Sequence, residues 1–229
     1  MSTLPARILT CKRCRTGELG KFIYYSPVYS FGNPEGKKVI VVAHNPSTRE
    51  FEDHGKDQTR PYLLNTGTVE ERLNDQLTYF DRPYYEQFFK KIETLFEGEN
   101  KKLLGWNRIC WEKVGFLDFT KCSTRTEKGQ WRTLRPKYRA EMIKNCEGYL
   151  LSQLEQYKPK AILSYGAFIC EWFGNKFGAA YSNPSATTIS TGNSDSVKLI
   201  FLYQRQGRQP HSAQEVTFVR RELAKALTD

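Results

Sequence analysis

Four short segments of this 229-residue chain are almost continuously apolar, and they constrain its fold more than any other feature. They are residues 37–44 (KKVIVVAH), 115–121 (GFLDFTK), 160–166 (KAILSYG) and 197–203 (VKLIFLY). Strands with this pattern are covered on both faces, as in parallel sheets. Because parallel strands need long crossover connections, usually helices, the four segments predict an α/β fold.

Helical periodicity occupies much of the chain around these segments. In residues 83–96, Tyr84, Phe88, Ile92 and Phe96 fall on one stripe, as in an amphipathic helix. Three more helices are predicted at 137–156, at 215–227 and from 167–173 onward. We therefore expect a three-layer α/β/α sandwich with a central four-stranded parallel sheet, formed by the whole chain (1–229) as a single domain. Such sheets bind their ligands at the carboxyl ends of the strands.

The balance of charges favours a polyanion as partner. Thirty-five Lys and Arg against 25 Asp and Glu give a net charge of +10, although a merely basic protein has the same balance. No apolar run approaches the ~20 residues of a membrane helix, and the first residues lack the apolar stretch of a secretory signal. We therefore expect a cytoplasmic chain without a membrane partner, whose cysteines are reduced or bound to metal.

Four of the six cysteines are placed as metal ligands could be. Cys11 and Cys14 form a C-x-x-C pair, Cys122 follows the second apolar segment, and Cys146 lies on the predicted helix after it. Four thiolates suit a tetrahedral zinc ion or an iron–sulfur cluster, but one C-x-x-C pair neither distinguishes these nor requires a metal. The other two cysteines are expected to be small buried residues, Cys110 and Cys170.

The first apolar segment ends in polar residues that a rigid strand would hold at the edge of the sheet. His44 and Asn45 follow Ala43 directly, and the chain then turns at Pro46 and Ser47. An ordinary strand exit with a proline turn has the same pattern. Other motifs in the chain indicate that this strand end belongs to a functional site.

Taken in order, these motifs resemble the uracil-DNA glycosylase superfamily, most closely its family 4, the iron–sulfur branch. The resemblance covers most of the chain and rests on CKRC (11–14), VVAHNPST (41–48), RPY (60–62), FLDFTKC (116–122), CEGYLLSQLEQYKPKAILSYGAFICEWF (146–173) and PHSA (210–213). It implies a uracil-DNA glycosylase-like fold and a monomeric DNA glycosylase, which flips a pyrimidine out of DNA and hydrolyses its bond to the sugar.

The resemblance also assigns a cofactor. Cys11, Cys14, Cys122 and Cys146 would hold a structural 4Fe–4S cluster, with zinc as the alternative. In the family the cluster fixes loops near the DNA.

The same resemblance implies roles around the flipped base. Tyr62 would stack on the ring, and Asn45 would orient the attacking water. His44 would also orient the water, act as a weak base or contact a phosphate, and His211 would donate to the base O2. Each of these side chains could instead be structural. Two further residues complete the expected base slot, Ala43 and Ser47.

Several residues depart from the pattern of family 4. His44 stands where that branch has an acidic residue, Ser47 replaces a glycine, and the loop between residues 46 and 60 is longer. His211 lies in a loop without the H-P-S tripeptide. These departures leave the fold expectation unchanged and bear on which base is excised.

Asp118 is the most informative departure, because it takes the place of the asparagine that reads the base edge. An ionised aspartate only accepts hydrogen bonds, so it suits the exocyclic amine of cytosine better than O4 of uracil. A protonated aspartate could also donate to cytosine N3, and burial would raise its pKa in that direction. We therefore expect the substrate to be an aberrant or modified pyrimidine, either uracil or a modified cytosine. The corresponding roles are base-excision repair and defence against base-modified phage DNA.

Basic residues in two predicted loops are expected to bind DNA phosphates, although a solvated basic surface has the same composition. They are Lys121, Arg125, Arg132, Arg135, Arg205 and Arg208.

Two other functions stay open at this point. One is a non-catalytic or RNA-directed binding module on the same fold, and the other is a zinc-stabilised nucleotide-binding protein unrelated to glycosylases. The enzyme hypothesis depends on one arrangement. Asn45, Asp118 and His211 must converge around a slot the size of one nucleobase, with Tyr62 above it.

Overall fold

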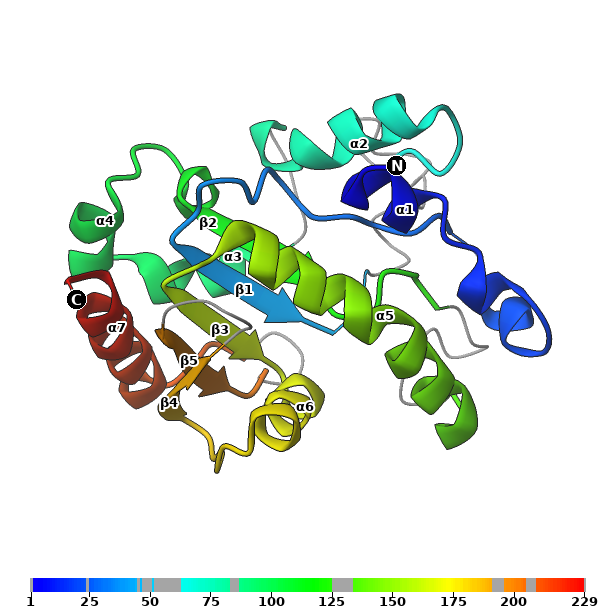
Figure 1. The fold of residues 1–229 in the computed structure, drawn as a ribbon. Coiled ribbons are helices and arrows are strands. Elements are labelled where there is room, and N and C mark those ends of the chain that lie inside the picture. The colour runs from blue at the N-terminus through cyan, green and yellow to red at the C-terminus, as the bar shows by residue number, and fades with distance from the viewer. Residues whose placement is uncertain are drawn as a thin grey trace. The chain divides into compact units, whose positions relative to one another are not determined.

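The structure is a computed structural model, drawn as a ribbon in Figure 1. It describes residues 2–23, 25–44, 46, 51, 63–82, 87–124, 134–190, 196–204 and 209–228. The chain groups into two compact, discontinuous units. Unit 1 comprises Met1–Asn33, Asn45–Tyr85 and Leu117–Gln153, and unit 2 comprises Pro34–His44, Glu86–Phe116 and Leu154–Asp229. Each unit is described by itself, so the single-domain expectation stays a prediction.

The fold is α/β and is organised by one five-stranded sheet with the order β2-β1-β3-β5-β4. Its strands are β1 (Val39–Ala43), β2 (Val114–Asp118), β3 (Ala161–Tyr165), β4 (Ser185–Ser190) and β5 (Ser196–Leu202). All four apolar segments of the sequence form strands, and every residue of β1, β2 and β3 is buried. The prediction of an α/β fold is therefore confirmed.

The sheet differs from the expected one in β4, which raises the number of strands from four to five. β1 pairs with β3 and β3 with β5 in parallel, whereas β4 pairs with β5 antiparallel. β4 stays partly exposed along most of its length, and its sequence, SATTIS, accordingly lacks a continuous apolar run.

The described residues form seven α-helices. They are α1 (Leu4–Leu9), α2 (Val69–Leu77), α3 (Gln87–Glu93), α4 (Glu99–Leu104), α5 (Pro136–Tyr157), α6 (Ala167–Phe177) and α7 (Ala213–Thr228). Short 3₁₀ helices occur at Arg13–Arg15, Leu19–Phe22, Tyr79–Asp81, Thr94–Phe96 and Cys110–Glu112. Within the described ranges, no helix combines the length and apolar character needed to cross a membrane.

Three of the four predicted helices are confirmed as α5, α6 and α7. In the fourth, predicted at 83–96, α3 and the 3₁₀ helix at Thr94–Phe96 account for the second part, and 83–86 lie outside the described residues. Sequence reasoning missed α2, although its start carries a readable signal. Thr68 and Glu71 form a capping box, in which each side chain binds the backbone N–H of the other.

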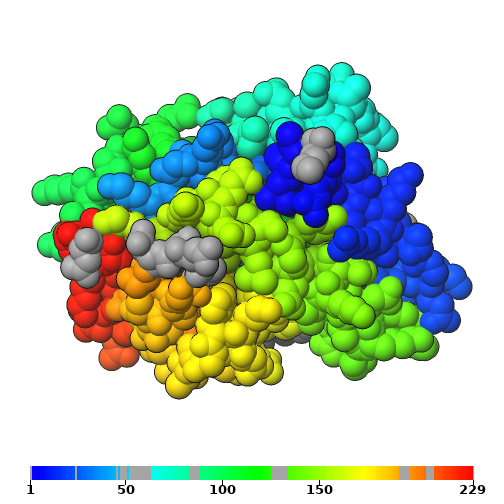
Figure 2. All heavy atoms as spheres, in the orientation of Figure 1, coloured from blue at the N-terminus to red at the C-terminus, as the bar shows by residue number. Residues whose placement is uncertain are grey.

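A buried glutamine links three segments of unit 1. Gln76 on α2 is fully buried, and its Oε1 accepts from the N–H of Tyr29 at 2.7 Å. The carbonyl of Tyr29 accepts in turn from Nε2 of Gln153 on α5 at 2.9 Å. Figure 2 shows the atoms of α1 and α2 side by side on the visible face of this unit, and contacts between the two helices agree. The extended segment through Tyr29 is therefore tied to a helix at each of its two polar backbone groups.

In unit 2, helices pack against the parallel strands. Both α6 and α7 contact β3 and β5, and α7 also contacts α4. Gly166 connects β3 to α6 with a φ of +116°, a conformation that favours glycine. Its N–H donates to the carbonyl of Leu202 at the end of β5, at 2.8 Å. The carboxyl ends of β3 and β5 are therefore held together where α6 begins.

We predict that Gln76→Leu lowers the free energy of unfolding by about 1–3 kcal/mol, because it leaves the buried Tyr29 N–H without its acceptor. Urea denaturation followed by tryptophan fluorescence measures the change. The exposed Gln156 on α5 offers a matched control, and Gln156→Leu should stay within about 0.5 kcal/mol of the wild type. Equal losses in both variants would contradict the role given to Gln76.

Candidate functional site

Unit 1 gathers cysteines that are far apart in the sequence. Cys14 lies in the 3₁₀ helix Arg13–Arg15, Cys122 follows β2, and Cys146 lies on α5. All three are at most 3% exposed. Cys14 and Cys122 belong to one buried apolar cluster, together with Leu19, Ile23, Leu134, Tyr138 and Met142. The apolar packing of this cluster holds the thiols out of water.

Hydrogen bonds show that these thiols are close neighbours. The pKa of Cys14 is lowered, first by a side-chain hydrogen bond with Cys122 and then by one with Cys146. The same bonds, together with burial, raise the pKa values of Cys122 and Cys146. A thiolate in this group is therefore stabilised by hydrogen bonds from its neighbouring thiols.

Cys11, the partner of Cys14 in the C-x-x-C pair, is partly exposed and borders the same group. Burial raises the pKa of Tyr149, and a hydrogen bond with Cys11 raises it further. Tyr149 lies on α5 three residues after Cys146, and the charge of Cys11 also raises the pKa of Cys122. The structure thus brings together the four cysteines that the sequence selected.

Two N–H groups point at sulfur atoms of this cysteine group. The backbone N–H of Lys121 donates to Cys146 Sγ, and Asn145 Nδ2 donates to Cys14 Sγ, both at 3.5 Å. Such bonds stabilise thiolate ligands in metal and iron–sulfur sites. Among the described residues, however, no three His, Cys, Asp or Glu side chains are arranged so that they could hold a metal ion.

The other two cysteines have a different setting. Cys110 and Cys170 are at most 1% exposed, and burial raises the pKa of both thiols, that of Cys170 to about 11. The expectation that they are buried is confirmed, and both lie in unit 2.

Two buried ionisable residues, Asp118 and Lys121, lie at and just after the end of β2. Asp118, the last residue of β2, is 3% exposed, and Lys121 is 1% exposed. Lys121 Nζ donates to the main-chain carbonyl of Asp118 at 2.6 Å, so this ammonium is turned inward. Within the described part of the chain, Asp118 Oδ2 is buried and has no hydrogen-bond partner.

The surroundings of this pair oppose ionisation of both groups. Burial raises the pKa of Asp118, and the charge of Lys121 counteracts this only in part. Burial likewise lowers the pKa of Lys121, opposed by Asp118 and Cys146. A buried carboxyl of this kind can be protonated near neutral pH and then donate a hydrogen bond.

In unit 2, His44 lies at the carboxyl end of the parallel strands. It follows β1 directly, after the buried Ala43, and is itself partly exposed. Its ring centroid lies 4.6 Å from that of Phe168 in the first turn of α6. The parallel order of β1, β3 and β5 thus places His44 at the sheet edge where α/β proteins bind ligands.

His211 belongs to a buried polar network near the same edge. Its side chain is 0% exposed, and its Nε2 lies 2.9 Å from the hydroxyl of Tyr165, the last residue of β3. Its Nδ1 lies 3.8 Å from Glu215 Oε2 on α7. That Oε2 accepts from the N–H and the hydroxyl of Ser212 at 2.8 and 3.0 Å, and Glu215 Oε1 accepts from Asn183 Nδ2 at 3.2 Å.

Sequence reasoning missed the partners of both histidines, Phe168, Tyr165 and Glu215. Tyr165 was included only as one letter of an apolar strand. Glu215 did carry a readable signal, because Ser212 and Glu215 match the S-x-x-E pattern of a capping box. That pattern predicts a helix start and gives no indication that the carboxylate faces a histidine.

Several predicted site residues lie outside the described residues. They are Asn45, Ser47, Tyr62, Arg125, Arg132, Arg205 and Arg208. Of the predicted DNA contacts within the described ranges, Arg135 is exposed just before α5, and Lys121 is buried. Asp118 belongs to unit 1 and His211 to unit 2. The expected convergence of Asn45, Asp118 and His211 under Tyr62 therefore stays a prediction.

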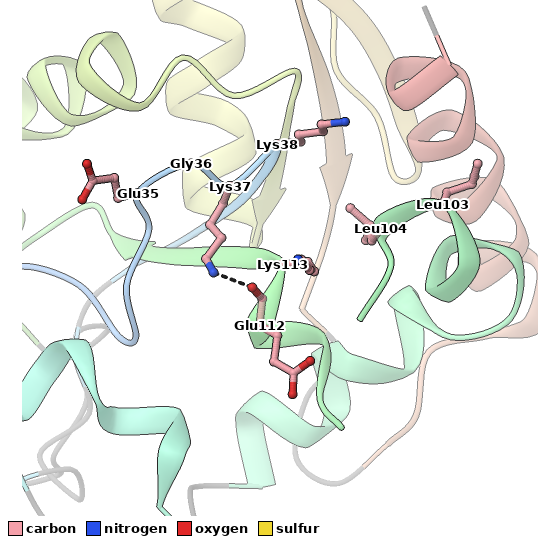
Figure 3. Close-up of a pocket in the computed structure, with 8 residues that line it drawn as sticks. All are labelled: Glu35, Gly36, Lys37, Lys38, Leu103, Leu104, Glu112 and Lys113. Carbon is pink, nitrogen blue, oxygen red and sulfur yellow. Dashed lines mark hydrogen bonds between the residues drawn. The ribbon is translucent and has the colours of Figure 1, made fainter. Parts of the chain in front are cut away.

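A hollow of about 430 Å³ lies at the other ends of the strands, in unit 2 (Figure 3). Lys37 and Lys38 line it just before β1, and Glu112 and Lys113 line it just before β2. Lys37 Nζ donates to the carbonyl of Glu112 at 2.5 Å. Because its lining is mainly charged, whereas ligand pockets are mostly apolar, we assign no ligand to this hollow.

No family model matches this chain, and no curated protein matches it significantly.

The Asp118 environment predicts a pH-dependent difference in stability between the wild type and Asp118→Asn. The folded pKa of Asp118 is raised, so its contribution to stability is fully present below the ordinary value of 3.8 and is lost as pH rises through the folded pKa. The amide side chain of the variant cannot ionise. We therefore expect the unfolding midpoint of the wild type to fall relative to that of the variant from mildly acidic to mildly alkaline pH.

Thermal unfolding of both proteins across this pH range measures the difference. One contrary result is a difference in unfolding midpoint between the wild type and Asp118→Asn that does not vary with pH, and another is a difference that changes in favour of the wild type as pH rises. Either result would show that ionisation of Asp118 does not destabilise the folded protein.

Proposed function

We propose that this protein is a DNA glycosylase of the iron–sulfur type, which hydrolyses the N-glycosidic bond of a flipped-out aberrant or modified pyrimidine and leaves an abasic site. One observation carries the proposal. Cys11, Cys14, Cys122 and Cys146 are separated by up to 135 residues in the sequence, yet they border one another in unit 1. This is the gathering that the resemblance to the glycosylase superfamily requires.

The proposal includes the architecture and setting of that superfamily. The mixed five-stranded sheet with its helices is compatible with a three-layer α/β/α sandwich of the uracil-DNA glycosylase kind. The net charge of +10 favours DNA as the partner. We further propose that the protein acts as a monomer in the cytoplasm.

The four cysteines would hold a 4Fe–4S cluster. The type of these donors suits such a cluster, because all four are thiols and two of the sulfur atoms accept N–H hydrogen bonds. When bound, the cluster would act as a structural crosslink between the N-terminal segment, the end of β2 and α5. The alternative is zinc, which the same thiols would coordinate tetrahedrally.

Asp118 supports a base with a cytosine-type edge. It lies four residues before Cys122, so a cluster at the cysteines would fix the strand end that carries its carboxyl. Oδ2 is buried and lacks a partner among the described residues, which costs free energy unless a ligand supplies one. An exocyclic amine of cytosine would donate to the ionised carboxylate, and the protonated form would donate to cytosine N3.

Base excision also needs side chains that hold the flipped base and orient the attacking water. Expelling a base from the stack costs a few kcal/mol, so a stacking ring is required, which we assign to Tyr62. Asn45 would orient the attacking water, and His44, which precedes it in the sequence, lies at the end of β1. Because excision of normal cytosine would damage any genome, we propose that the substrate is uracil or a substituted cytosine. The role would be base-excision repair or defence against modified phage DNA.

One observation favours a second candidate, a non-catalytic nucleic-acid-binding module on the same fold. The side chain of His211, which was expected to donate to the base, is fully buried and bonded to Tyr165. A binding module needs no such donor. The assay below separates the two candidates, because only the enzyme produces abasic sites.

We predict that the purified protein creates alkali-sensitive sites in oligonucleotides that carry a 5-substituted cytosine or uracil. Asp118→Asn should shift the preference toward uracil, because an amide can both donate to O4 and accept from N3–H. We expect a change in the ratio of the two rates of about tenfold or more, corresponding to ~1–3 kcal/mol of base discrimination.

Single- and double-stranded oligonucleotides with hypoxanthine and with normal cytosine complete the panel. Binding without cleavage on every substrate would favour the non-catalytic module. If Asp118→Asn cleaves with an unchanged base preference, the glycosylase hypothesis stands, but Asp118 is not the residue that recognises the base.

We also predict that the protein, purified without oxygen, contains iron and sulfide and absorbs near ~400 nm. Cys14→Ser and Cys146→Ser should each lose most of this absorbance, whereas Cys170→Ala should retain it, because Cys170 belongs to unit 2 and not to the unit that contains the four cysteines. Metal analysis that finds zinc instead would select the alternative. Loss of iron in Cys170→Ala alone would reject the assigned ligand set.

A further inference from the structure

The hydroxyl of Tyr165 has a single hydrogen-bond partner within the described part of the chain, His211 Nε2 at 2.9 Å. Tyr165 is 1% exposed, and its ring packs edge-on against that of Phe88 at 5.7 Å between centroids. Burial raises the pKa of this phenol, so it keeps its proton. A buried hydroxyl carries one proton, and that proton needs an acceptor.

This requirement distinguishes the protonation states of His211. If Nε2 carried a hydrogen, Tyr165 could only accept from it, and the phenolic proton would be buried without an acceptor. The doubly protonated imidazolium has the same defect, because it too carries a hydrogen on Nε2. A bare Nε2 accepts from Tyr165, and both groups are then satisfied.

The opposite side of the ring agrees with this assignment. Glu215 Oε2 lies 3.8 Å from Nδ1, so the negative charge of this carboxylate favours a proton on Nδ1 rather than on Nε2. Ser212 and Asn183 hold that carboxylate through three hydrogen bonds. Its position is therefore fixed by the start of α7 and by the segment before β4.

We propose that Tyr165 and Glu215 are positioning residues that hold His211 as a neutral imidazole with its proton on Nδ1. His211 then joins the end of β3 to the first turn of α7, and its Nε2 has no proton to give to a base. The protonation state follows from unit 2 alone. Its consequence for base excision, that His211 is not the donor to the base O2, rests on the proposed function.

Imidazole ¹⁵N NMR tests the protonation state directly, because the chain has only three histidines. Long-range ¹H–¹⁵N spectra at mildly alkaline pH should show His211 with a protonated Nδ1 and a bare Nε2, and His211→Gln identifies its signals. In Tyr165→Phe, the Nε2 signal should shift and a share of the Nε2-protonated form should appear. Tyr181→Phe, which removes a hydroxyl elsewhere in unit 2, should leave the His211 signals in place.

Glu215→Gln supplies a second variant that keeps the helix start, because glutamine also serves in a capping box. Without the negative charge, the share of the Nε2-protonated form should rise. A wild-type His211 that is protonated on Nε2, or signals that are the same in all variants, would overturn the inference. A failure of base excision would reject the proposed function and would leave this spectral result unaffected.

Discussion

Exclusion of water from the carboxyl ends of β2 and β3 is the constraint on which the rest of this structure depends. Both strands are buried up to their last residues, Asp118 and Tyr165, so polar groups there are costly to leave without partners in the protein. At the end of β3, Tyr165 bonds to His211. After β2, Lys121 bonds to the carbonyl of Asp118. These groups are held in place because each of them is costly to leave unsatisfied.

The cysteine group follows from the same constraint. Cys14, Cys122 and Cys146 are buried together, and the N–H groups of Lys121 and Asn145 are directed at their sulfur atoms. A negative charge shared by buried thiols needs such donors, just as a cluster or a zinc ion does. The position of Cys122 four residues after Asp118 links this group to the end of β2. Asp118 differs from these satisfied groups, because its Oδ2 is buried and has no hydrogen-bond partner among the described residues. A group that binds a ligand would have the same property.

Much of the fold was predictable because burial leaves a pattern in the sequence. The four apolar segments became strands, and α5, α6 and α7 matched the predicted helices. β4 was not predictable in this way, since most of its residues are partly exposed and its sequence, SATTIS, lacks a continuous apolar run. α2 was missed for a different reason. Its boundary is defined by a capping box rather than by an apolar stripe, and only one of its residues, Gln76, is buried.

The sequence indicated which types of residue form the candidate site, but not which residues their side chains contact. By itself the sequence indicated candidate residues for chemistry, namely four cysteines, an aspartate at a strand end and two histidines, because these types are rare in apolar surroundings. It also determined that the strands would be buried. Only the tertiary structure decided that Lys121 turns inward, that His211 is covered and bonded to Tyr165, and that Glu215 faces its ring. The physical reason is that these contacts join residues between 3 and 46 positions apart. The packing of β3 against α7 sets the contact of Tyr165 with His211, and no local pattern in the sequence records it.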